Sequence, residues 1–237
     1  EAAMPDAKGK IFFVGRLDGL GARLSSMLDA IWLADRFGGR FRFHWFNTAQ
    51  SPQEPVIRPR TEVFSAAFLQ AHHVDIAQFR SWTPRPLSGL PMPLEDALRP
   101  DSGIDCFSIT WAPLRLQGPG LSALAAEGRD RRAAFDAIGF SPALERARRL
   151  AATVALPPGA AALHLRAGDV VHGPYRAGGG HHGRVISYPI ALHILRQRAE
   201  AGVPMILFGQ DAALCEHAKH AHGAVLAADL TAGLGFT

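Results

Sequence analysis

The order of apolar runs and amphipathic stretches is the feature that most narrows the possible folds of this chain. Short apolar runs at 161–166, 203–208 and 224–227 alternate with two stretches of helical periodicity, at 187–202 and 211–220. Strands joined by helices of this length pair in parallel, because a parallel connection needs a crossover. These residues predict a βαβαβ unit, half of a doubly wound sheet whose ligands lie beyond the carboxyl ends of the strands.

The N-terminal half begins with the same alternation. Residues 10–15 form an apolar run that ends at a glycine, residues 24–34 carry apolar side chains at helical spacing, and residues 40–46 alternate with a period of two. A glycine-rich loop separates the first run from the helical stretch. We therefore expect a strand, a glycine loop, a helix and a strand, the beginning of another parallel α/β layer.

The middle of the chain is less regular. Eight of the seventeen prolines fall between residues 51 and 100, where we expect long loops and short helices because proline removes a backbone donor. Residues 104–111 alternate like another strand. Residues 121–154 have helical character with a break before Ser141, which is placed to cap a helix that has Pro142 at its first position.

A run of two prolines and a glycine at 157–159 separates the two regular patterns. Such a run ends a helix, because proline cannot continue it and glycine favours a turn. The sequence therefore predicts two α/β domains, one over residues 1–158 and one over residues 159–237.

Composition narrows the class of protein. The formal net charge is +4, and all but three of the 25 basic residues are arginines, without a basic run that carries interleaved aromatic residues. A nucleic-acid partner is therefore not expected. Two cysteines are too few for a disulfide framework, and no stretch approaches the roughly 20 apolar residues of a membrane span. We expect a bacterial, cytoplasmic protein whose native start is Met4.

Two polar side chains interrupt the apolar run at 161–166. His164 and Arg166 point to one face of the predicted strand, which ends at Gly168 and Asp169, where sheets of this kind place their ligands. A guanidinium at this place needs a partner, since leaving it buried and unpaired costs several kcal/mol. That partner is either Asp169, in a salt bridge that closes the turn and leaves His164 as a core histidine, or a ligand oxyanion.

Three segments resemble one family. The segment HLRAGD at 164–169 matches HxRxGD, which is similar to the α1,2-, α1,6- and protein O-fucosyltransferases, including the rhizobial nodulation type. The loop at 15–24 resembles the GGLGNRL opening of these families, and LFGQD at 207–211 is similar to their strand that ends in an aspartate. The order of these segments along the chain is also that of the family.

The resemblance implies a GT-B-like fold, in which two Rossmann-type domains face a cleft, the N-terminal one on the acceptor side and the C-terminal one binding the nucleotide sugar. It implies inverting transfer of fucose from GDP-fucose to a glycan hydroxyl without a required metal or other cofactor. Arg166 would hold the β-phosphate of the departing diphosphate. The charge-assisted hydrogen bonds from its guanidinium would strengthen as negative charge develops on the phosphate oxygens.

The resemblance also implies roles for other residues. Asp18 is the best-placed carboxylate for a catalytic base, although an exposed turn aspartate is the simpler interpretation and the leaving phosphate could take the proton instead. Arg16 and Arg23 either face the nucleotide or are ordinary surface arginines. The donor-binding residues implied by the motifs are His164, Gly168, Asp169, Gly19, Gly21, Arg23, Gln210 and Asp211.

Three departures from the family pattern keep alternatives open. Ala22 replaces the asparagine of the loop motif, Ala167 replaces a second arginine, and the chain ends at Thr237, ahead of the family's serine-containing donor motif. We therefore expect an incomplete C-terminal domain. The alternatives are a noncatalytic module that binds nucleotide sugars or other partners on the same scaffold, and a transferase that uses another nucleotide sugar.

Other kinds of site are less well supported. Gly19 and Gly21 supply only part of a dinucleotide fingerprint, and no acidic residue ends the second strand as a ribose partner. The histidines near residues 217–222 lack the cysteines or carboxylates that would complete a zinc site. The glycine run at 178–183 is either a loop over the cleft or an ordinary flexible loop.

Overall fold

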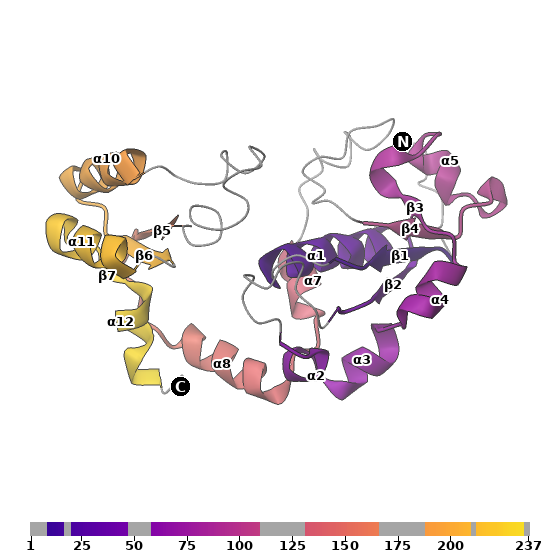
Figure 1. Cartoon of the computed structure of the whole chain (residues 1–237), viewed down its shortest axis with the longest axis horizontal. Coiled ribbons are helices and arrows are strands. Elements are labelled where there is room, and N and C mark those ends of the chain that lie inside the picture. The colour runs from indigo at the N-terminus through magenta and orange to yellow at the C-terminus, as the bar shows by residue number, and fades with distance from the viewer. Residues whose placement is uncertain are drawn as a thin grey trace. The chain divides into compact units, whose positions relative to one another are not determined.

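The computed structural model describes residues 9–16, 20–46, 58–109, 131–165, 188–209 and 212–234. The chain forms an N-terminal unit, Glu1–Leu144, and a C-terminal unit, Glu145–Thr237. The division falls within helix α8 (Pro142–Ala152), just ahead of the boundary that the sequence predicts at residue 158. Each unit is a parallel α/β structure, which confirms the predicted fold class of two Rossmann-type units (Figure 1).

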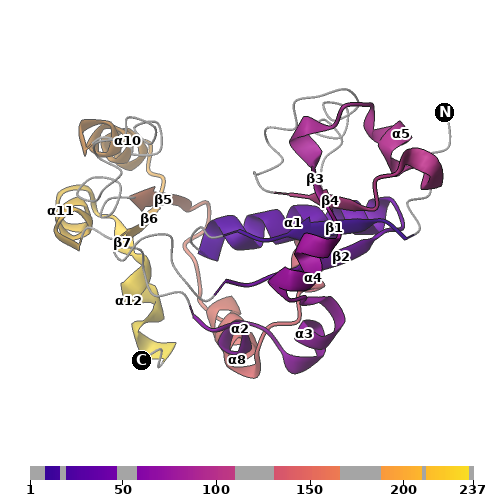
Figure 2. The same ribbon diagram turned by 45° about the vertical axis from the view of Figure 1, so that its right-hand side comes forward.

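The N-terminal unit is built on a four-stranded parallel sheet with the order β2-β1-β4-β3. Its strands are β1 (Ile11–Val14), β2 (Arg40–Phe43), β3 (Arg85–Pro86) and β4 (Cys106–Ser108). Helix α1 (Leu20–Arg36) connects β1 to β2 and packs against both, as Figures 1 and 2 show. The strand, helix and strand predicted at the start of the chain are confirmed.

Short elements fill the proline-rich middle of the chain, as its composition predicts. They are α2 (Arg60–Val63), α3 (Ala66–His72), α4 (Ile76–Ser81), α5 (Leu94–Leu98) and two 3₁₀ turns, Leu87–Gly89 and Pro100–Ser102. The strand predicted at 104–111 is shorter, because β4 covers only Cys106–Ser108. The structure describes residues 131–154 of the helical region predicted at 121–154, and they contain α7 (Arg131–Asp136) and α8.

The predicted cap of α8 is present. The backbone N–H of Leu144 donates to Ser141 Oγ at 3.3 Å, and Pro142 opens the helix. The same hydroxyl donates to the carbonyl oxygen of Glu62 at 2.7 Å, so Ser141 also ties the start of α8 to α2. A side-chain oxygen at this position satisfies a helix donor that otherwise lacks a partner.

Aromatic side chains dominate the core of the N-terminal unit. Alternate residues of the segment 41–45, Phe41, Phe43 and Trp45, are buried, so the predicted period of two extends beyond the last residue of β2. Phe12 stacks on Phe107 of the neighbouring strand, with ring centroids 5.4 Å apart. Offset aromatic pairs of this kind add to the free energy gained by burying their area. The sheet is therefore held from within by rings on adjacent strands.

A polar stripe on α1 is also buried. Asp29 has a side chain that is 0% exposed, and it accepts two hydrogen bonds from the guanidinium of Arg131 on α7, at 3.2 and 3.3 Å. Arg23 and Ser26 lie on the same helix and are buried as well. A buried carboxylate is tolerated when a cation and hydrogen bonds compensate for its lost hydration. This pair therefore fixes α7 against α1.

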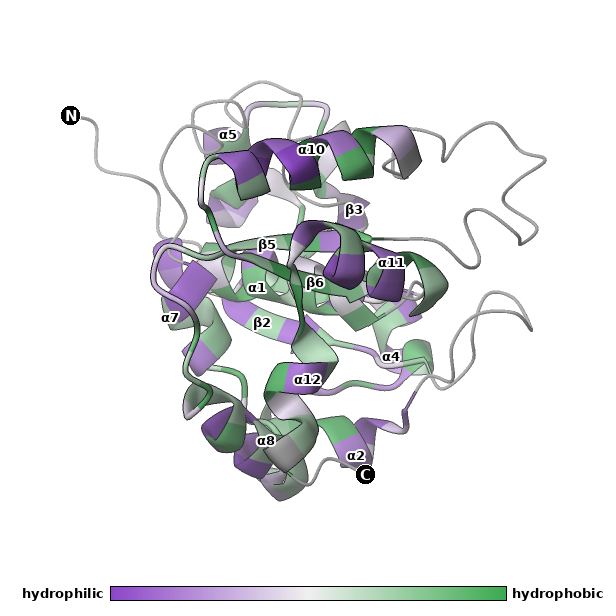
Figure 3. Cartoon of the chain, turned by 90° about the vertical axis from the view of Figure 1, so that its left-hand side faces the viewer, coloured by the Kyte–Doolittle hydropathy of each residue, from purple (hydrophilic) through white to green (hydrophobic). Residues whose placement is uncertain are grey.

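The C-terminal unit contains a three-stranded parallel sheet with the order β5-β6-β7. Its elements in chain order are β5 (Ala161–Leu165), α10 (Tyr188–Glu200), β6 (Met205–Gly209), α11 (Ala212–His222), β7 (Val225–Leu226), α12 (Ala227–Thr231) and a 3₁₀ turn, Ala232–Leu234. Helices α10 and α11 carry both hydrophobic and hydrophilic residues, as expected for helices that bury one face (Figure 3). The predicted βαβαβ order is confirmed.

The Asp29–Arg131 pair gives a first prediction. Arg131→Ala leaves a fully buried carboxylate without this partner, and we expect the free energy of unfolding of the N-terminal unit to fall by about 3 kcal/mol. Adding Asp29→Asn should restore part of that loss, because it removes the buried charge that Arg131 otherwise balances. Urea titration followed by tryptophan fluorescence measures this, since all four tryptophans lie in the N-terminal unit. An Arg131→Ala protein as stable as the unsubstituted chain would contradict the assignment.

Candidate functional site

Two exposed rings lie side by side at the carboxyl edge of the C-terminal sheet. His164 pairs with Phe208 in the parallel register of β5 and β6, and their rings are stacked with centroids 4.8 Å apart and an interplanar angle of 9°. His164 is exposed, and 44% of the Phe208 surface is accessible to solvent. A flat aromatic surface of this kind is suited to stacking against a nucleobase or a sugar ring.

The alternation along β5 explains why His164 is exposed. Leu163 and Leu165 are buried in the core of the C-terminal unit, and His164 between them lies on the opposite face. The alternative that His164 is a core histidine is therefore wrong. The sequence placed His164 and Arg166 on one face of the strand without deciding whether that face is buried, and it treated Phe208 only as part of an apolar run.

Gly209 brings the ends of β5 and β6 close together. It pairs with Leu165, and a Cβ atom at this glycine would collide with the backbone carbonyl oxygen of Leu165. Backbone cannot move aside as cheaply as a flexible side chain, so any larger residue would push the two strand ends apart. Glycine is therefore required at position 209, one residue after Phe208, where β6 pairs with Leu165 at the end of β5. This requirement accounts for the glycine of the LFGQD segment.

The other predicted donor residues follow these strand ends directly in the sequence. Arg166, Gly168 and Asp169 come after β5, which ends at Leu165, while Gln210 and Asp211 come after β6, which ends at Gly209. All five lie outside the described residues. Asp18 and Gly19, which precede α1, lie outside them as well. Their proposed roles stay predictions.

Gly21 is in the first turn of α1 and is exposed, and a Cβ atom there would meet no other atom within 4 Å. Packing of the described part of the N-terminal unit therefore gives no reason for a glycine at this position. A glycine in a helix costs about 1 kcal/mol relative to alanine. Close approach of a ligand to the backbone would explain the residue.

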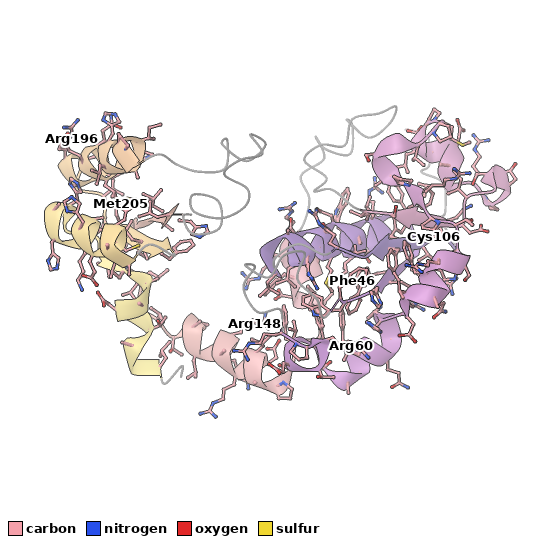
Figure 4. All side chains as sticks on the ribbon, in the orientation of Figure 1. Phe46, Arg60, Cys106, Arg148, Arg196 and Met205 are labelled. Atoms are coloured by element: carbon pink, nitrogen blue, oxygen red, sulfur yellow. The ribbon has the colours of Figure 1, made fainter. Side chains whose placement is uncertain are left out.

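Arg23 has a structural role that the sequence did not predict. It is only 2% exposed, its guanidinium donates to the carbonyl oxygen of Phe46 at 2.6 Å, and its Cζ lies 4.8 Å from the centroid of the Trp45 ring. These contacts join α1 to the segment after β2, near the labelled Phe46 in Figure 4. Arg16 donates to Ser26 Oγ at 3.1 Å. Arg23 is therefore not a surface arginine.

A histidine pair beside β2 was missed by the sequence analysis. The Nδ1 atom of His44 lies 2.8 Å from the carbonyl oxygen of Val74, and the rings of His44 and His73 have centroids 5.4 Å apart. His73 Nε2 is buried without a hydrogen-bond partner. The available signal was the same as for His164, a histidine on the alternate face of a strand at its carboxyl end.

Burial lowers the pKa of His73 to about 4, with smaller effects of Arg60 and His44 in the same direction and an opposing effect of Asp75. Loss of hydration disfavours the charged form of the imidazole. Burial also lowers the pKa of the adjacent His72. His73 is therefore neutral in the folded protein at neutral pH.

Cys106 is unsuited to nucleophilic chemistry. It is buried in the sheet of the N-terminal unit (Figure 4), and burial, with a smaller contribution from Asp105, raises the pKa of its thiol to about 12. Among the described residues, no three histidine, cysteine or acidic side chains gather in a group that could hold a metal ion. Nor does any helix in these parts of the chain have the length and hydropathy needed to cross a membrane.

No model of a protein family matches the chain, and no curated protein matches it. Several solved structures of GDP-fucose-dependent fucosyltransferases are similar to it. The NodZ α-1,6-fucosyltransferase co-crystallised with GDP is 14% identical, with a TM-score of 0.46 over 92% of this chain and 77% of that one.

The fucosyltransferase NodZ from Bradyrhizobium is 15% identical with a TM-score of 0.48 over the same shares of the two chains. POFUT1 in complex with GDP is 14% identical with a TM-score of 0.39, over 94% of this chain and 84% of that one.

The lowered pKa of His73 predicts a pH dependence of stability. Between about pH 6.5 and pH 4 the unfolded chain binds a proton that the folded protein does not, so stability falls as the pH is lowered through this window. We expect the urea midpoint of the N-terminal unit to fall between pH 7.5 and pH 5, and to fall less steeply in His73→Asn. His72→Asn serves as the comparison and should flatten the dependence less. Equal slopes in His73→Asn and the unsubstituted chain would contradict the assignment.

Proposed function

We propose that the chain is a glycosyltransferase that transfers fucose from GDP-fucose to a glycan hydroxyl with inversion at the anomeric carbon. The observation that carries this proposal is the stacked pair of His164 and Phe208, exposed at the carboxyl edge of β5 and β6. Ligands of parallel α/β sheets bind at this edge. The pair would form one wall of the donor site, against which a planar part of the nucleotide stacks.

The sequence next to this pair supports a diphosphate ligand. Arg166 follows the last residue of β5, and the motif HxRxGD that contains it is the one that resembles the fucosyltransferases. In the proposed reaction the bond between fucose C1 and the β-phosphate oxygen breaks, and its electron pair stays on the departing GDP. The guanidinium would stabilise that growing negative charge through bidentate hydrogen bonds.

Three further features fit the same donor site. Gly168 would let the backbone approach the phosphates, Asp169 would orient the loop, and Gln210 and Asp211 would contact the nucleotide from the end of β6. In the N-terminal unit, Gly21 is exposed and sterically unexplained, as expected of a residue that faces a ligand. We propose that the reaction needs no metal ion, because the guanidinium of Arg166 supplies the positive charge that a metal ion would otherwise provide.

The proposal predicts that binding of GDP depends on Arg166. Arg166→Ala should weaken GDP binding by about 10- to 100-fold, because charge-assisted hydrogen bonds to the phosphates are lost. Arg198→Ala is the matched control, since Arg198 is an exposed arginine on α10 of the same unit. Isothermal titration with GDP, GDP-fucose and UDP measures both effects.

Unchanged GDP affinity in Arg166→Ala would contradict the phosphate role. Preference for UDP over GDP would assign the scaffold to another nucleotide sugar. Release of GDP from GDP-fucose separates an enzyme from a binding module. Tight GDP binding without any release, with or without a glycan acceptor, would favour the noncatalytic alternative that Ala22 and Ala167 suggest.

The proposal also predicts that the stacked pair of His164 and Phe208 contributes to GDP binding. Phe208→Ala should weaken GDP binding by about 5- to 100-fold, because stacking of a base on an aromatic side chain contributes roughly 1–3 kcal/mol. Binding of inorganic pyrophosphate, which has no base, should not change, and Phe208→Trp should retain GDP affinity. Leu156→Ala is the control, because Leu156 is an exposed apolar residue of the same unit, at 60%, and precedes β5 in the chain. Equal loss of GDP and pyrophosphate affinity in Phe208→Ala would contradict a stacking role.

A further inference from the structure

Two arginines lie on the outermost strand of the N-terminal sheet. β2 stands at one end of the strand order β2-β1-β4-β3, and Arg40 and Arg42 alternate along it with buried Phe41 and Phe43 (Figure 2). Residues two apart on a strand point to the same face, with Cα atoms about 7 Å apart. Both guanidinium groups therefore extend from one face of the sheet, at its edge.

The rest of this face is covered by apolar side chains. Phe13, the partner of Arg42 in the register of β1 and β2, stacks on Phe79 of α4 with ring centroids 3.7 Å apart, and Trp82 packs edge-on against it. On β2, by contrast, Arg40 is exposed and Arg42 is only half-buried. The two arginines are thus accessible at the rim of a covered face.

Neither arginine forms an ion pair with any residue in the parts of the chain that the structure describes. The guanidinium of Arg40 donates to the carbonyl oxygen of Gly9 at 3.2 Å, and that of Arg42 donates to the carbonyl oxygen of Phe41 at 2.9 Å. A guanidinium carries five N–H donors, so most of them stay unused in these contacts. Several other arginines of this unit contact carboxylates instead, namely Arg58, Arg99, Arg131 and Arg132.

The charges around Arg42 have one sign. Burial, with a smaller effect of Arg40, lowers the pKa of Arg42. His72 Nδ1 lies 3.3 Å from the same carbonyl oxygen of Phe41, and burial lowers the pKa of His72, with a smaller effect of Arg42 in the same direction. Holding like charges together in a partly desolvated place costs free energy. A bound anion would offset that cost.

The edge of β2 is closed to an added strand. The carbonyl oxygen of Phe41 accepts from Arg42, and that of Phe43 accepts from the backbone N–H of Val74 at 2.9 Å. An extended peptide that joins a sheet needs such backbone groups to be unpaired. Recognition at this edge would therefore come from the arginine side chains and not from the backbone.

Nucleic acid fits the edge poorly as well. Single strands bind through aromatic side chains on which the bases stack, in addition to basic groups. The aromatic residues that alternate with the two arginines, Phe41 and Phe43, are buried and present no face to a base. A linear ligand that carries repeated oxyanions and needs no stacking matches the row of guanidinium groups better.

We propose that Arg40 and Arg42 form a binding site for an acidic glycan, a sugar chain that carries carboxylate groups. Each guanidinium would hold one carboxylate through two parallel N–H···O hydrogen bonds, with donors that its present contacts leave unused. The choice of a glycan rests on the proposed function, whereas the binding of an anion by these arginines does not. The site belongs to the N-terminal unit alone and requires no residue of the C-terminal unit.

The test compares a short oligogalacturonate, with one carboxylate on each sugar, with its methyl ester, which has the same sugars without the charge. We expect the full chain to bind the acid with an affinity that falls as salt is added, and to bind the ester about 10-fold more weakly or less. Arg40→Gln/Arg42→Gln should weaken binding of the acid by about 10- to 100-fold, because the charge-assisted hydrogen bonds are lost. Isothermal titration measures each affinity.

Arg85→Gln/Arg99→Gln is the matched control. It removes the same charge from two exposed positions of the same unit, one on β3 and one after α5, and should leave binding unchanged. Arg42→Lys keeps the charge without the planar guanidinium and should give an intermediate affinity. Arg40→Gln alone should weaken binding by about 3- to 10-fold, and because Arg40 is exposed this variant avoids disturbing the packing of the sheet.

The outcomes are distinct. Unchanged affinity for the acid in both Arg40→Gln and the double variant would overturn the proposal, as would equal binding of acid and ester. Tighter binding of a single-stranded oligonucleotide, lost in the same variants, would assign the surface to nucleic acid instead of a glycan.

GDP affinity separates this inference from the proposed function. A chain that binds GDP but not oligogalacturonate would overturn the inference and leave the proposed function standing. A chain that binds oligogalacturonate through Arg40 and Arg42 but does not bind GDP would overturn the proposed function and support the anion site.

Discussion

The close pairing of β5 with β6 at their carboxyl ends is the constraint on which the account of this protein depends. Gly209 lies so near Leu165 that only glycine fits, and this approach holds the next pair in the register, His164 and Phe208, in a parallel stack. Because the leucines of β5 fill the core on one face, the two rings are left exposed on the other. Burial of apolar side chains thus creates the polar and aromatic edge at which we place the donor.

The two units share one strand pattern. In each, a strand alternates between buried apolar residues and polar ones, and a histidine occupies the last polar position at the carboxyl end. The environments of the two rings differ. A carbonyl oxygen lies within hydrogen-bond distance of the His44 ring, whereas an aromatic ring covers one face of His164. The same strand pattern therefore places the two histidine rings in different surroundings.

Local patterns predicted much of the fold. The order of strands and helices, the parallel pairing that it requires and the Ser141 cap all follow from periodicity and from residue types at neighbouring positions. The pairing of the two-residue β3 with β4 and the exact helices between residues 60 and 81 did not follow, because they depend on contacts between segments distant in sequence.

The candidate site shows the same limit. The burial of Arg23 depends on Phe46 and Trp45, more than twenty residues later in the chain, and a charged residue gives no local sign of such partners. His44 carried the same alternation signal as His164, but its contact with the carbonyl of Val74, thirty residues later in the chain, was not predictable. Phe208 was predictable as a strand residue, whereas its exposure and its stacking on His164 required the register of β5 and β6.

The central claim is that the edge formed by His164 and Phe208 holds the nucleotide of the donor. Carbon–proton NMR spectra of these two rings during a GDP titration test it most directly. The account predicts that both sets of ring resonances shift together and saturate with the same dissociation constant as the phosphorus resonances of GDP, since a stacked base changes the ring-current field at both rings. Ring resonances that stay in place while GDP binds elsewhere on the chain would contradict it.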